Sequence, residues 1–352
     1  MQNVHGLGIY CFAQDKSNDL IFTGSMDCSI GILEIKDKFI EPRMMHKLRD
    51  VHDGCVECLQ FCEMNRILYS GSCDRSIKIW SFPTKTIIPV LLHHLENVND
   101  KGISFMYINF VNQHLIVTGS AEKNIKIFDM AGIQDSDKPP ELICDFVAHE
   151  RGISHCQFDP TSHRIYSAGL PDNALNIFSI QDCSKDQGPV FLATYKNFYI
   201  ETVKRMAVDI KNQLVYIVDG WLGTSLKIFD ISNGNSAELI HLMSQVHKSD
   251  ITSLLLDTQN KILYTGSRDK SIKMFKFRKD CRCPILMHHF EDVHDGAITA
   301  LYIDPVNPVL FSGSYDLSIK VILVQTTDNS PKLRYNLENI HKGGVNCLCI
   351  DP

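Results

Sequence analysis

Long apolar runs are missing from this 352-residue sequence, and none approaches the roughly 18 residues that a membrane-spanning helix requires. The amino terminus does not combine a basic segment with a long apolar stretch, so we expect no secretory signal. Neither sign of charge dominates, because 35 basic and 41 acidic residues give a net charge of −6. This balance makes nucleic acid an unlikely partner, since a dedicated nucleic-acid-binding domain would be strongly basic.

Signatures of common enzyme classes are also missing. The sequence has no phosphate-binding P-loop, no dinucleotide-binding glycine motif before a helix, no nucleophile elbow and no H-E-x-x-H zinc motif. Histidine, serine and aspartate do recur together, which could suggest a catalytic triad. They recur on a regular structural period, however, so we assign them a structural role. We therefore predict no catalytic residues, no cofactor and no enzymatic activity.

The 13 cysteines are an odd number and lie mostly in apolar, strand-like segments such as CVECLQFC at 55–62. Secreted domains would be expected to pair their cysteines in disulfides, whereas buried thiols behave as small apolar residues. We therefore expect reduced cysteines in a cytoplasmic or nuclear protein.

One pattern repeats along the whole chain: a histidine, an apolar strand, a turn of small residues ending in aspartate, and another apolar strand. Its clearest copy joins VHDGCVECLQF (51–61) to RILYSGSCDRSIKIW (66–80). In four copies the aspartate follows the histidine by 22 residues: His5 and Asp27, His52 and Asp74, His247 and Asp269, His294 and Asp316. The apolar residues alternate or form short runs rich in Ile, Val, Leu, Tyr and Phe, which predicts strands.

Seven such units follow from the turn positions, which are 46 to 51 residues apart: Asp27, Asp74, Glu122, Asp172, Gly223, Asp269 and Asp316. The units span about 1–50, 51–97, 98–147, 148–201, 202–245, 246–292 and 293–339. A unit of four short strands has an unpaired apolar face, which radial stacking of the units would bury. We predict one all-β domain over 1–352, a seven-bladed β-propeller of four-stranded antiparallel blades.

The last segment, 340–352, repeats the histidine and the first strand of a blade and then stops. We expect it either to duplicate the first strand of the chain or to open a longer protein.

These repeats resemble the WD-repeat family, and the resemblance covers essentially the whole chain. It implies a hydrogen-bonded tetrad in each blade: a histidine before the first strand, Ser or Thr in the second, the turn aspartate, and Trp in the third. Blade 2 matches at all four positions, with His52, Ser70, Asp74 and Trp80. The resemblance gives partial tetrads in four other blades: His5, Thr23 and Asp27; His149, Ser167 and Asp172; His247, Thr265 and Asp269; His294, Ser312 and Asp316. A tetrad would hold two loops together and have a structural role.

Metal binding is an alternative that we considered for two groups of residues. The pairs His93–His94 and His288–His289 occur in similar segments, but adjacent strand residues point to opposite faces. Cys281 and Cys283 near His288 are the best zinc candidate, although C-x-C lacks the usual C-x₂₋₄-C spacing. We therefore predict no bound metal.

The basic stretch KFRKDCRC at 276–283 carries four positive charges between two predicted strands. It could contact phosphate, a lipid headgroup, RNA or an acidic partner. Because Asp280 interrupts the run, an exposed loop without a ligand is the preferred interpretation.

Blade 5 departs from the repeat at two positions, with Glu201 in place of histidine and Gly223 in place of aspartate. Phe198, Tyr199 and Trp221 lie in the same loops, and exposed aromatic residues often anchor interfaces. A degenerate blade in which Trp221 only covers the core is an equally weighted alternative.

The resemblance also implies that partners bind on the face formed by the loops between blades and by the turns that carry the aspartates. The corresponding positions here include Tyr10, Met26, Glu57, Cys73, Ser104, Pro171, Lys204, Leu222, Thr252, Arg268, Thr299 and Tyr315. If the ring closes, Tyr10 and Tyr315 become neighbours. We expect the main ligand over blades 5 and 6, with Trp221 as its anchor and Lys204 and Arg268 as charge partners.

We therefore predict a non-catalytic scaffold or substrate-recruiting module that binds protein or peptide partners. By analogy, it would belong to a larger ubiquitin ligase, signalling or RNA-processing assembly. The alternative is a reader of phosphate, lipid headgroups or RNA through the 276–283 loop.

Overall fold

The computed structural model describes residues 5–34, 43–83, 88–109, 112–119, 122–170, 172–196, 203–219, 222–233, 237–277, 284–303, 309–324, 331–337 and 344–345. The described residues form seven four-stranded sheets, in each of which consecutive strands pair in antiparallel fashion. The fold is a seven-bladed β-propeller, as the repeat predicts. In every blade we call the four strands a to d in chain order, and we describe the two compact units of the chain separately.

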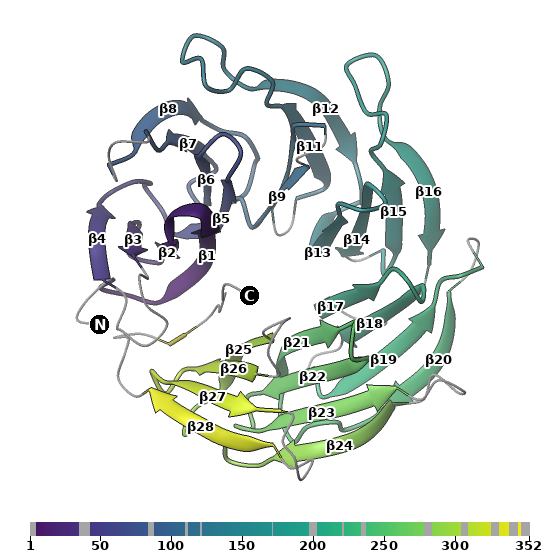
Figure 1. Cartoon of the computed structure of the whole chain (residues 1–352). Helices are drawn as coiled ribbons and strands as arrows, with labels where there is room; N and C mark the ends of the chain where they lie inside the picture. The colour runs from purple at the N-terminus through teal and green to yellow at the C-terminus, as the bar shows by residue number, and fades with distance from the viewer. Residues whose placement is uncertain are drawn as a thin grey trace. The chain divides into compact units, whose positions relative to one another are not determined.

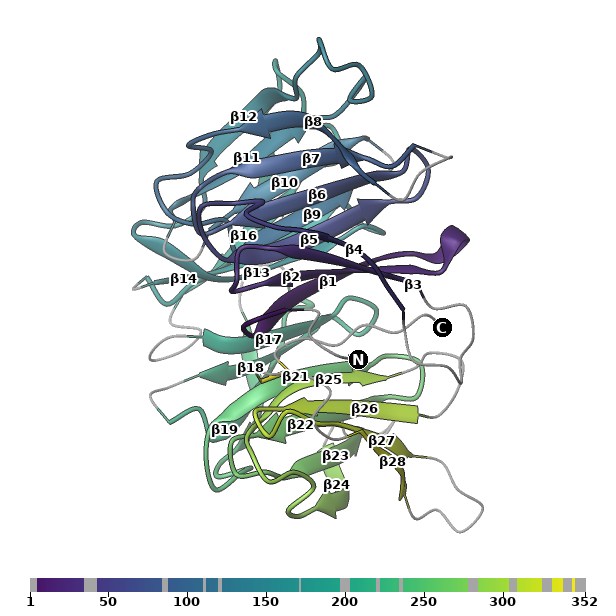
Figure 2. The ribbon, with the colours of Figure 1, turned by 90° about the vertical axis from the view of Figure 1, so that its left-hand side faces the viewer.

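The first unit, Asn3–Asn197, holds blades 1 to 4 (Figure 1). Blade 1 also has a short 3-10 helix, η1 (Lys16–Asn18), between its first two strands. The strands are β1 (Ile9–Asp15), β2 (Leu20–Ser25), β3 (Ile30–Glu34) and β4 (Arg43–Leu48) in blade 1; β5 (Val56–Cys62), β6 (Ile67–Ser72), β7 (Ile77–Ser81) and β8 (Val90–Leu95) in blade 2; β9 (Phe105–Asn109), β10 (His114–Thr118), β11 (Asn124–Asp129) and β12 (Glu141–Val147) in blade 3; β13 (Gly152–Asp159), β14 (Arg164–Leu170), β15 (Leu175–Ser179) and β16 (Val190–Tyr195) in blade 4. Figure 2 shows the strands of blades 2 and 3 running side by side.

The second unit, Phe198–Pro352, holds blades 5 to 7. Its strands are β17 (Val203–Asp209), β18 (Leu214–Asp219), β19 (Ser225–Asp230) and β20 (Glu238–Met243) in blade 5; β21 (Ile251–Asp257), β22 (Ile262–Ser267), β23 (Ile272–Phe277) and β24 (Pro284–Phe290) in blade 6; β25 (Ile298–Ile303), β26 (Val309–Ser314), β27 (Ile319–Leu323) and β28 (Lys332–Leu337) in blade 7. All 28 strands fall inside the seven sequence units, whose assignment to a single domain stays a prediction.

Blades within a unit pack through a small residue in strand b that faces an apolar residue opening the next strand a. A Cβ atom on Gly71 would lie 2.7 Å from Ile103, and one on Gly266 would lie 2.7 Å from Ile298. The SGS sequence of strand b therefore allows blades to approach closely. Strand b also carries a large buried tyrosine in blades 2, 4, 5 and 6: Tyr69, Tyr166, Tyr216 and Tyr264.

The described part of the C-terminal half-repeat lies on blade 7 in the same way. The Val345 amide donates to the Ser314 carbonyl at 3.0 Å, as the Ile103 amide does to Ser72 at 2.8 Å. Val345 is buried beside Gly313. Gly344–Val345 therefore covers strand b of blade 7 as the start of a following blade would.

Candidate functional site

The loops between blades (d–a loops) and the turns between strands b and c lie at the same end of each blade, which we call the top. The complete tetrad of blade 2 is at this end. His52 Nδ1 lies 2.9 Å from Asp74 Oδ2, and its Nε2 lies 2.9 Å from Ser70 Oγ. The Trp80 indole donates to the same Ser70 oxygen at 3.1 Å. These contacts hold the d–a loop, strands b and c and the b–c turn together.

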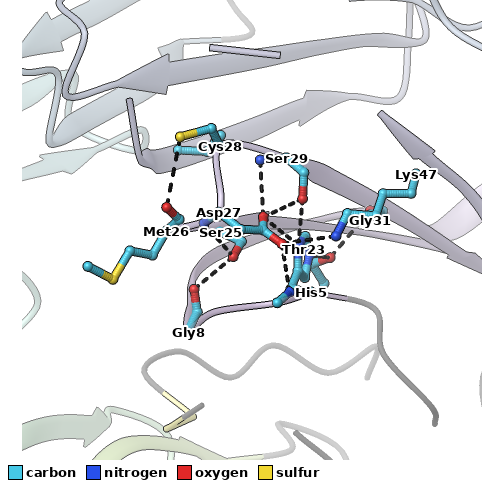
Figure 3. A network of polar contacts seen from close by, with 12 residues as sticks. His5, Gly8, Thr23, Ser25, Met26, Asp27, Cys28, Ser29, Gly31 and Lys47 are labelled. Carbon is cyan, nitrogen blue, oxygen red and sulfur yellow. Dashed lines mark hydrogen bonds and ion pairs between the residues drawn. The ribbon is translucent and has the colours of Figure 1, made fainter. Parts of the chain in front are cut away.

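Four other blades contain the histidine links that the resemblance implies. Nδ1 of His5, His149, His247 and His294 lies 3.1, 2.8, 3.0 and 2.9 Å from the turn aspartate, respectively. Nε2 of the same histidines lies 2.7 to 2.9 Å from the strand-b hydroxyl of Thr23, Ser167, Thr265 and Ser312. Figure 3 shows the network in blade 1.

A serine two residues after the aspartate completes the network, and our sequence analysis missed it. In blade 2, Ser76 Oγ donates to Asp74 Oδ1 at 2.7 Å and lies 2.9 Å from His52 Nδ1. Ser271 and Ser318 make the same contacts in blades 6 and 7. The recurrent D-x-S sequence was the signal that could have identified these residues.

A strand-c lysine forms a second link that the sequence analysis missed. Lys273 Nζ donates to the carbonyl of Val246, the residue before His247, at 2.6 Å. Lys78 bonds to the Val51 carbonyl in the same way in blade 2. Each lysine therefore ties strand c to the d–a loop beside the histidine.

Burial and charge shift the ionisation of these groups in opposite ways. Burial lowers the pKa of His52 and of His247 to about 4, against the opposing effect of Asp74 and Asp269. Burial acts to raise the pKa of Asp269, but the Ser271 hydroxyl and His247 outweigh it and lower that pKa to about 2. At neutral pH the network is therefore a neutral imidazole bonded to a carboxylate, which suits a structural link.

Blades 3 and 4 keep only parts of this network. In blade 3 the Glu122 carboxylate accepts from the Lys101 amide, as Asp74 accepts from the Asp53 amide in blade 2. Blade 4 keeps His149 and Asp172, but the serine position holds Ala174. Accordingly, Asp172 Oδ1 has no hydrogen-bond partner among the described residues.

In blade 5 the turn has a different backbone. Gly223 has a φ of +54°, and a Cβ atom there would lie 2.7 Å from Lys204 Cδ. The Lys204 ammonium lies 3.3 Å from Asp250 Oδ1, and the Arg268 guanidinium lies 3.8 Å from Asp250 Oδ2. Asp250, which the sequence analysis did not single out, therefore partly neutralises both expected charge partners.

The remaining residues that were expected to anchor a ligand cannot be placed. Phe198, Tyr199, Glu201 and Trp221 lie outside the described residues. Their contribution stays a sequence-based prediction.

The predicted contact positions fall into two structural classes. The residue before the turn aspartate, or before Gly223 in blade 5, is exposed in five blades: Met26, Cys73, Leu222, Arg268 and Tyr315. The second class sits at the start of strand a and is only partly exposed: Tyr10, Glu57, Ser104, Lys204, Thr252 and Thr299. Pro171 lies outside the described residues.

Members of the second class make contacts inside the fold. In all blades except blade 3, the register shifts near the start of strand a, so that residue 10, 57, 154, 204, 252 or 299 forms a bulge. Thr252 and Thr299 hydroxyls donate to the carbonyls of Ile298 and Val345. The Glu57 carboxylate accepts from Ser104 at 2.6 Å. These side chains therefore link successive strands a within each unit.

No group of three or more metal-ligating side chains occurs among the described residues. His93 Nε2 lies 3.3 Å from the Ile133 carbonyl, and His94 Nδ1 lies 3.6 Å from Glu96. The adjacent histidines thus have separate contacts. Cys281, Cys283 and most of the basic 276–283 loop lie outside the described residues.

A cavity of about 290 Å³ lies at the opposite end of blades 2 and 3, where Met64, Tyr69, Gln113 and Ile133 contribute to its wall. Sequence reasoning did not find it, because its wall combines residues from two blades. Within the described part of the chain, no helix is long and apolar enough to cross a membrane.

Comparison with known proteins agrees with this geometry. The family described as "WD domain, G-beta repeat" matches residues 2–32, 44–81, 239–276 and 286–322. These segments cover strands a to c of blades 1, 2, 6 and 7, which are the blades where histidine, aspartate and both hydroxyls are all present. The family model therefore matches the blades in which the network of histidine, aspartate and two hydroxyls is complete.

Among solved structures, Sqt1 of Saccharomyces cerevisiae is similar over 97% of this chain and 88% of its own, with a TM-score of 0.74 and 13% identity. Sqt1 of Chaetomium thermophilum bound to the N-terminus of the ribosomal protein L10 is similar over 95% of this chain and 88% of its own, with a TM-score of 0.72 and 15% identity. At such identities the likeness shows the fold alone.

One curated relative is the CCR4-associated factor 4 homolog of the yeast Vanderwaltozyma polyspora. It is 27% identical over 139 residues, which cover 36% of this chain and 19% of the relative. The match thus spans about a fifth of that protein.

Proposed function

Because this chain belongs to the WD-repeat family, whose propellers generally act as interaction modules without catalysis, we propose that it binds a segment of a partner protein on the top of blades 5 to 7. A role as scaffold or substrate-recruiting module of a larger assembly is part of this proposal.

The observation that carries the proposal is a row of large exposed side chains in three successive blades of one unit. Leu222 is 67% exposed and Tyr315 is 57% exposed, and Arg268 is exposed between them in blade order. Tyrosine and arginine are enriched among the residues that dominate protein–protein binding. The equivalent positions of blades 1 and 2 carry Met26 and the smaller Cys73, which offer less contact area and no charge.

One solved structure is compatible with this use of the fold. The Chaetomium Sqt1 structure contains the N-terminus of a ribosomal protein, so a propeller of this fold can take a protein segment as ligand.

Affinity capture tests the proposal. The full chain and a variant with Leu222→Ser, Arg268→Ser and Tyr315→Ser serve as baits in cell extract, and bound proteins are quantified by mass spectrometry. We expect at least one partner to be lost from the variant by tenfold or more, because these side chains are exposed and their truncation leaves the core intact.

The matched control is a variant with Met26→Ser and Cys73→Ser, which changes the equivalent positions of the first unit. It should retain the same partners. Equal capture by the parent and the triple variant, with both folded by circular dichroism, would refute binding at blades 5 to 7.

A further inference from the structure

Blade 5 carries a half-buried arginine at a position where four other blades have a small neutral side chain. Arg205 follows the strand-a bulge of β17 and pairs in register with Val218. The equivalent residues of blades 1, 2, 6 and 7 are Cys11, Cys58, Ser253 and Ala300, each paired with a strand-b glycine. A guanidinium therefore replaces a small neutral side chain in the blade that lacks the network.

The contacts of Arg205 do not balance its charge. Its Nε donates to the Thr252 carbonyl at 2.6 Å, and its Nη1 donates to the Lys204 carbonyl at 2.7 Å. Among the described residues no carboxylate forms an ion pair with it, and the nearby Asp250 pairs with Lys204 and Arg268 instead. Burial lowers the pKa of Arg205, while Tyr315 has the opposite effect. A partly desolvated cation held only by neutral carbonyls is costly unless an anion compensates it.

The remaining donors are arranged for such an anion. A guanidinium has five N–H groups in a planar fork, and the two bonds above leave one on Nη1 and both on Nη2. Parallel N–H groups on this edge match the two oxygens of a carboxylate.

We propose that Arg205 binds a carboxylate of the partner segment, from an Asp or Glu side chain or from a chain terminus. This inference rests on the proposed function and names the chemistry that the surface recognises. A carboxylate fits better than a phosphate, because one guanidinium balances a single negative charge and the neighbouring cations are already paired with Asp250. The chain's net charge of −6 further disfavours a dianion.

A peptide array tests this assignment. The full chain is incubated with eight-residue peptides that carry Glu, Gln or phosphoserine at each position in turn, and also with free or amidated C-termini. Affinities of the best Glu peptide and its Gln counterpart are then measured in solution by fluorescence anisotropy. We expect the carboxylate to improve binding by about tenfold or more, as a charge-assisted hydrogen-bonded pair does.

Variants identify the residues responsible. Arg205→Met should abolish the preference for carboxylate over amide, and Arg205→Lys should keep part of it. The matched control, Arg334→Met, removes an exposed arginine on strand β28 of blade 7 and should leave the preference unchanged. Thermal unfolding of Arg205→Met checks its folding, and we expect its midpoint to be no lower than the parent's.

The outcomes separate this inference from the proposed function. Equal binding of Glu and Gln peptides, a preference for phosphoserine, or a carboxylate preference that survives Arg205→Met each overturns the assignment. An array without any carboxylate-dependent position does so too. The capture experiment with the triple variant then decides separately whether this surface binds protein at all.

Discussion

Blades 2 and 5 have the same four strands but use the top of the blade differently. In blade 2, His52 bonds to Asp74 and Ser70, and Trp80 bonds to Ser70, so the polar side chains of the loop and turn are bonded inside the fold. In blade 5 the turn contains Gly223 with a positive φ, and Leu222, the residue before it, is exposed. The comparison teaches that blade 5 forms its turn without the network, whereas blades 6 and 7 contain the network and still expose Arg268 and Tyr315 in their turns.

Acid should have the largest effect on the difference in stability between blades that contain the histidine–aspartate network and blades that lack it. The pKa values of His52 and His247 are lowered to about 4, against about 6.5 in an unfolded chain, so the unfolded state binds more protons between these values. Stability therefore falls as the pH decreases from about 6.5 to 4, by about 1.4 kcal/mol per pH unit for each of these histidines.

Below pH 4 a second loss follows from the carboxylates. The pKa values of Asp269 and Asp316 are lowered to about 2, so the stability they contribute is present above about 3.9 and lost as the pH falls toward 2. Urea unfolding at pH 7, 5.5 and 4.5 measures the histidine part. The decrease of the free energy of unfolding with falling pH should be smaller in a variant with His52→Gln and His247→Gln. A parent whose stability is constant over this range would contradict the expectation.

His52→Ala should break the network of blade 2 and make it resemble blade 5. It removes the bonds to Ser70, Ser76 and Asp74 and leaves a carboxylate without its imidazole. We expect a loss of about 1–3 kcal/mol, as for a buried hydrogen bond to a charged group. The unfolding midpoint of the variant decides the matter, and an unchanged midpoint would mean that the network does not stabilise the fold. Partner binding should survive in the folded protein.

Gly223→Ala tests the glycine that replaces aspartate in blade 5. The φ of +54° disfavours any side chain, and the new Cβ would press against Lys204 Cδ. We expect destabilisation of about 1 kcal/mol, measured by urea unfolding. Gly6→Ala is a suitable control in blade 1, because its Cβ would meet only Asp27 at 3.8 Å. Equal effects of both substitutions would show that the blade 5 turn is not specially constrained.

Ala174→Ser should make blade 4 more like blade 2. The new hydroxyl would stand where Ser76 stands and could donate to Asp172 Oδ1, which lacks a partner among the described residues. We expect a gain of about 0.5–1.5 kcal/mol, in contrast to a loss of similar size for Ser76→Ala. Chemical denaturation of both variants measures the pair, and a destabilised Ala174→Ser would show that blade 4 has no room for the hydroxyl.

The fold could be predicted because its repeat is visible in local residue types. The 22-residue spacing from His52 to Asp74 recurs in other blades, and alternating apolar residues mark the strands. Ser76 and Lys78 recur just as regularly, yet their contacts were missed. Ser76 contacts His52, whose role was already assigned, and Lys78 bonds to the Val51 carbonyl, 27 positions away in the chain.

The candidate site was predicted less completely. Sequence comparison of blades identified the turn positions, and Leu222, Arg268 and Tyr315 are indeed exposed. It also placed Thr252 and Thr299 among the contact residues, although their hydroxyls bond to the following strand a. The bulge at these positions depends on how strand a pairs with strand b, which the order of residues in one strand does not reveal.

The sequence by itself determined the repeat and the strands, because these follow from residue types at fixed spacing, and its resemblance to the WD-repeat family implied the histidine–aspartate links. Tertiary structure alone decided that Asp250 neutralises Lys204 and Arg268 and that Arg205 is left with carbonyl partners. The physical reason is that a charge is balanced by whatever lies within a few ångströms of it. For these residues that environment includes backbone and side chains of the neighbouring blade, about 47 positions away in the chain.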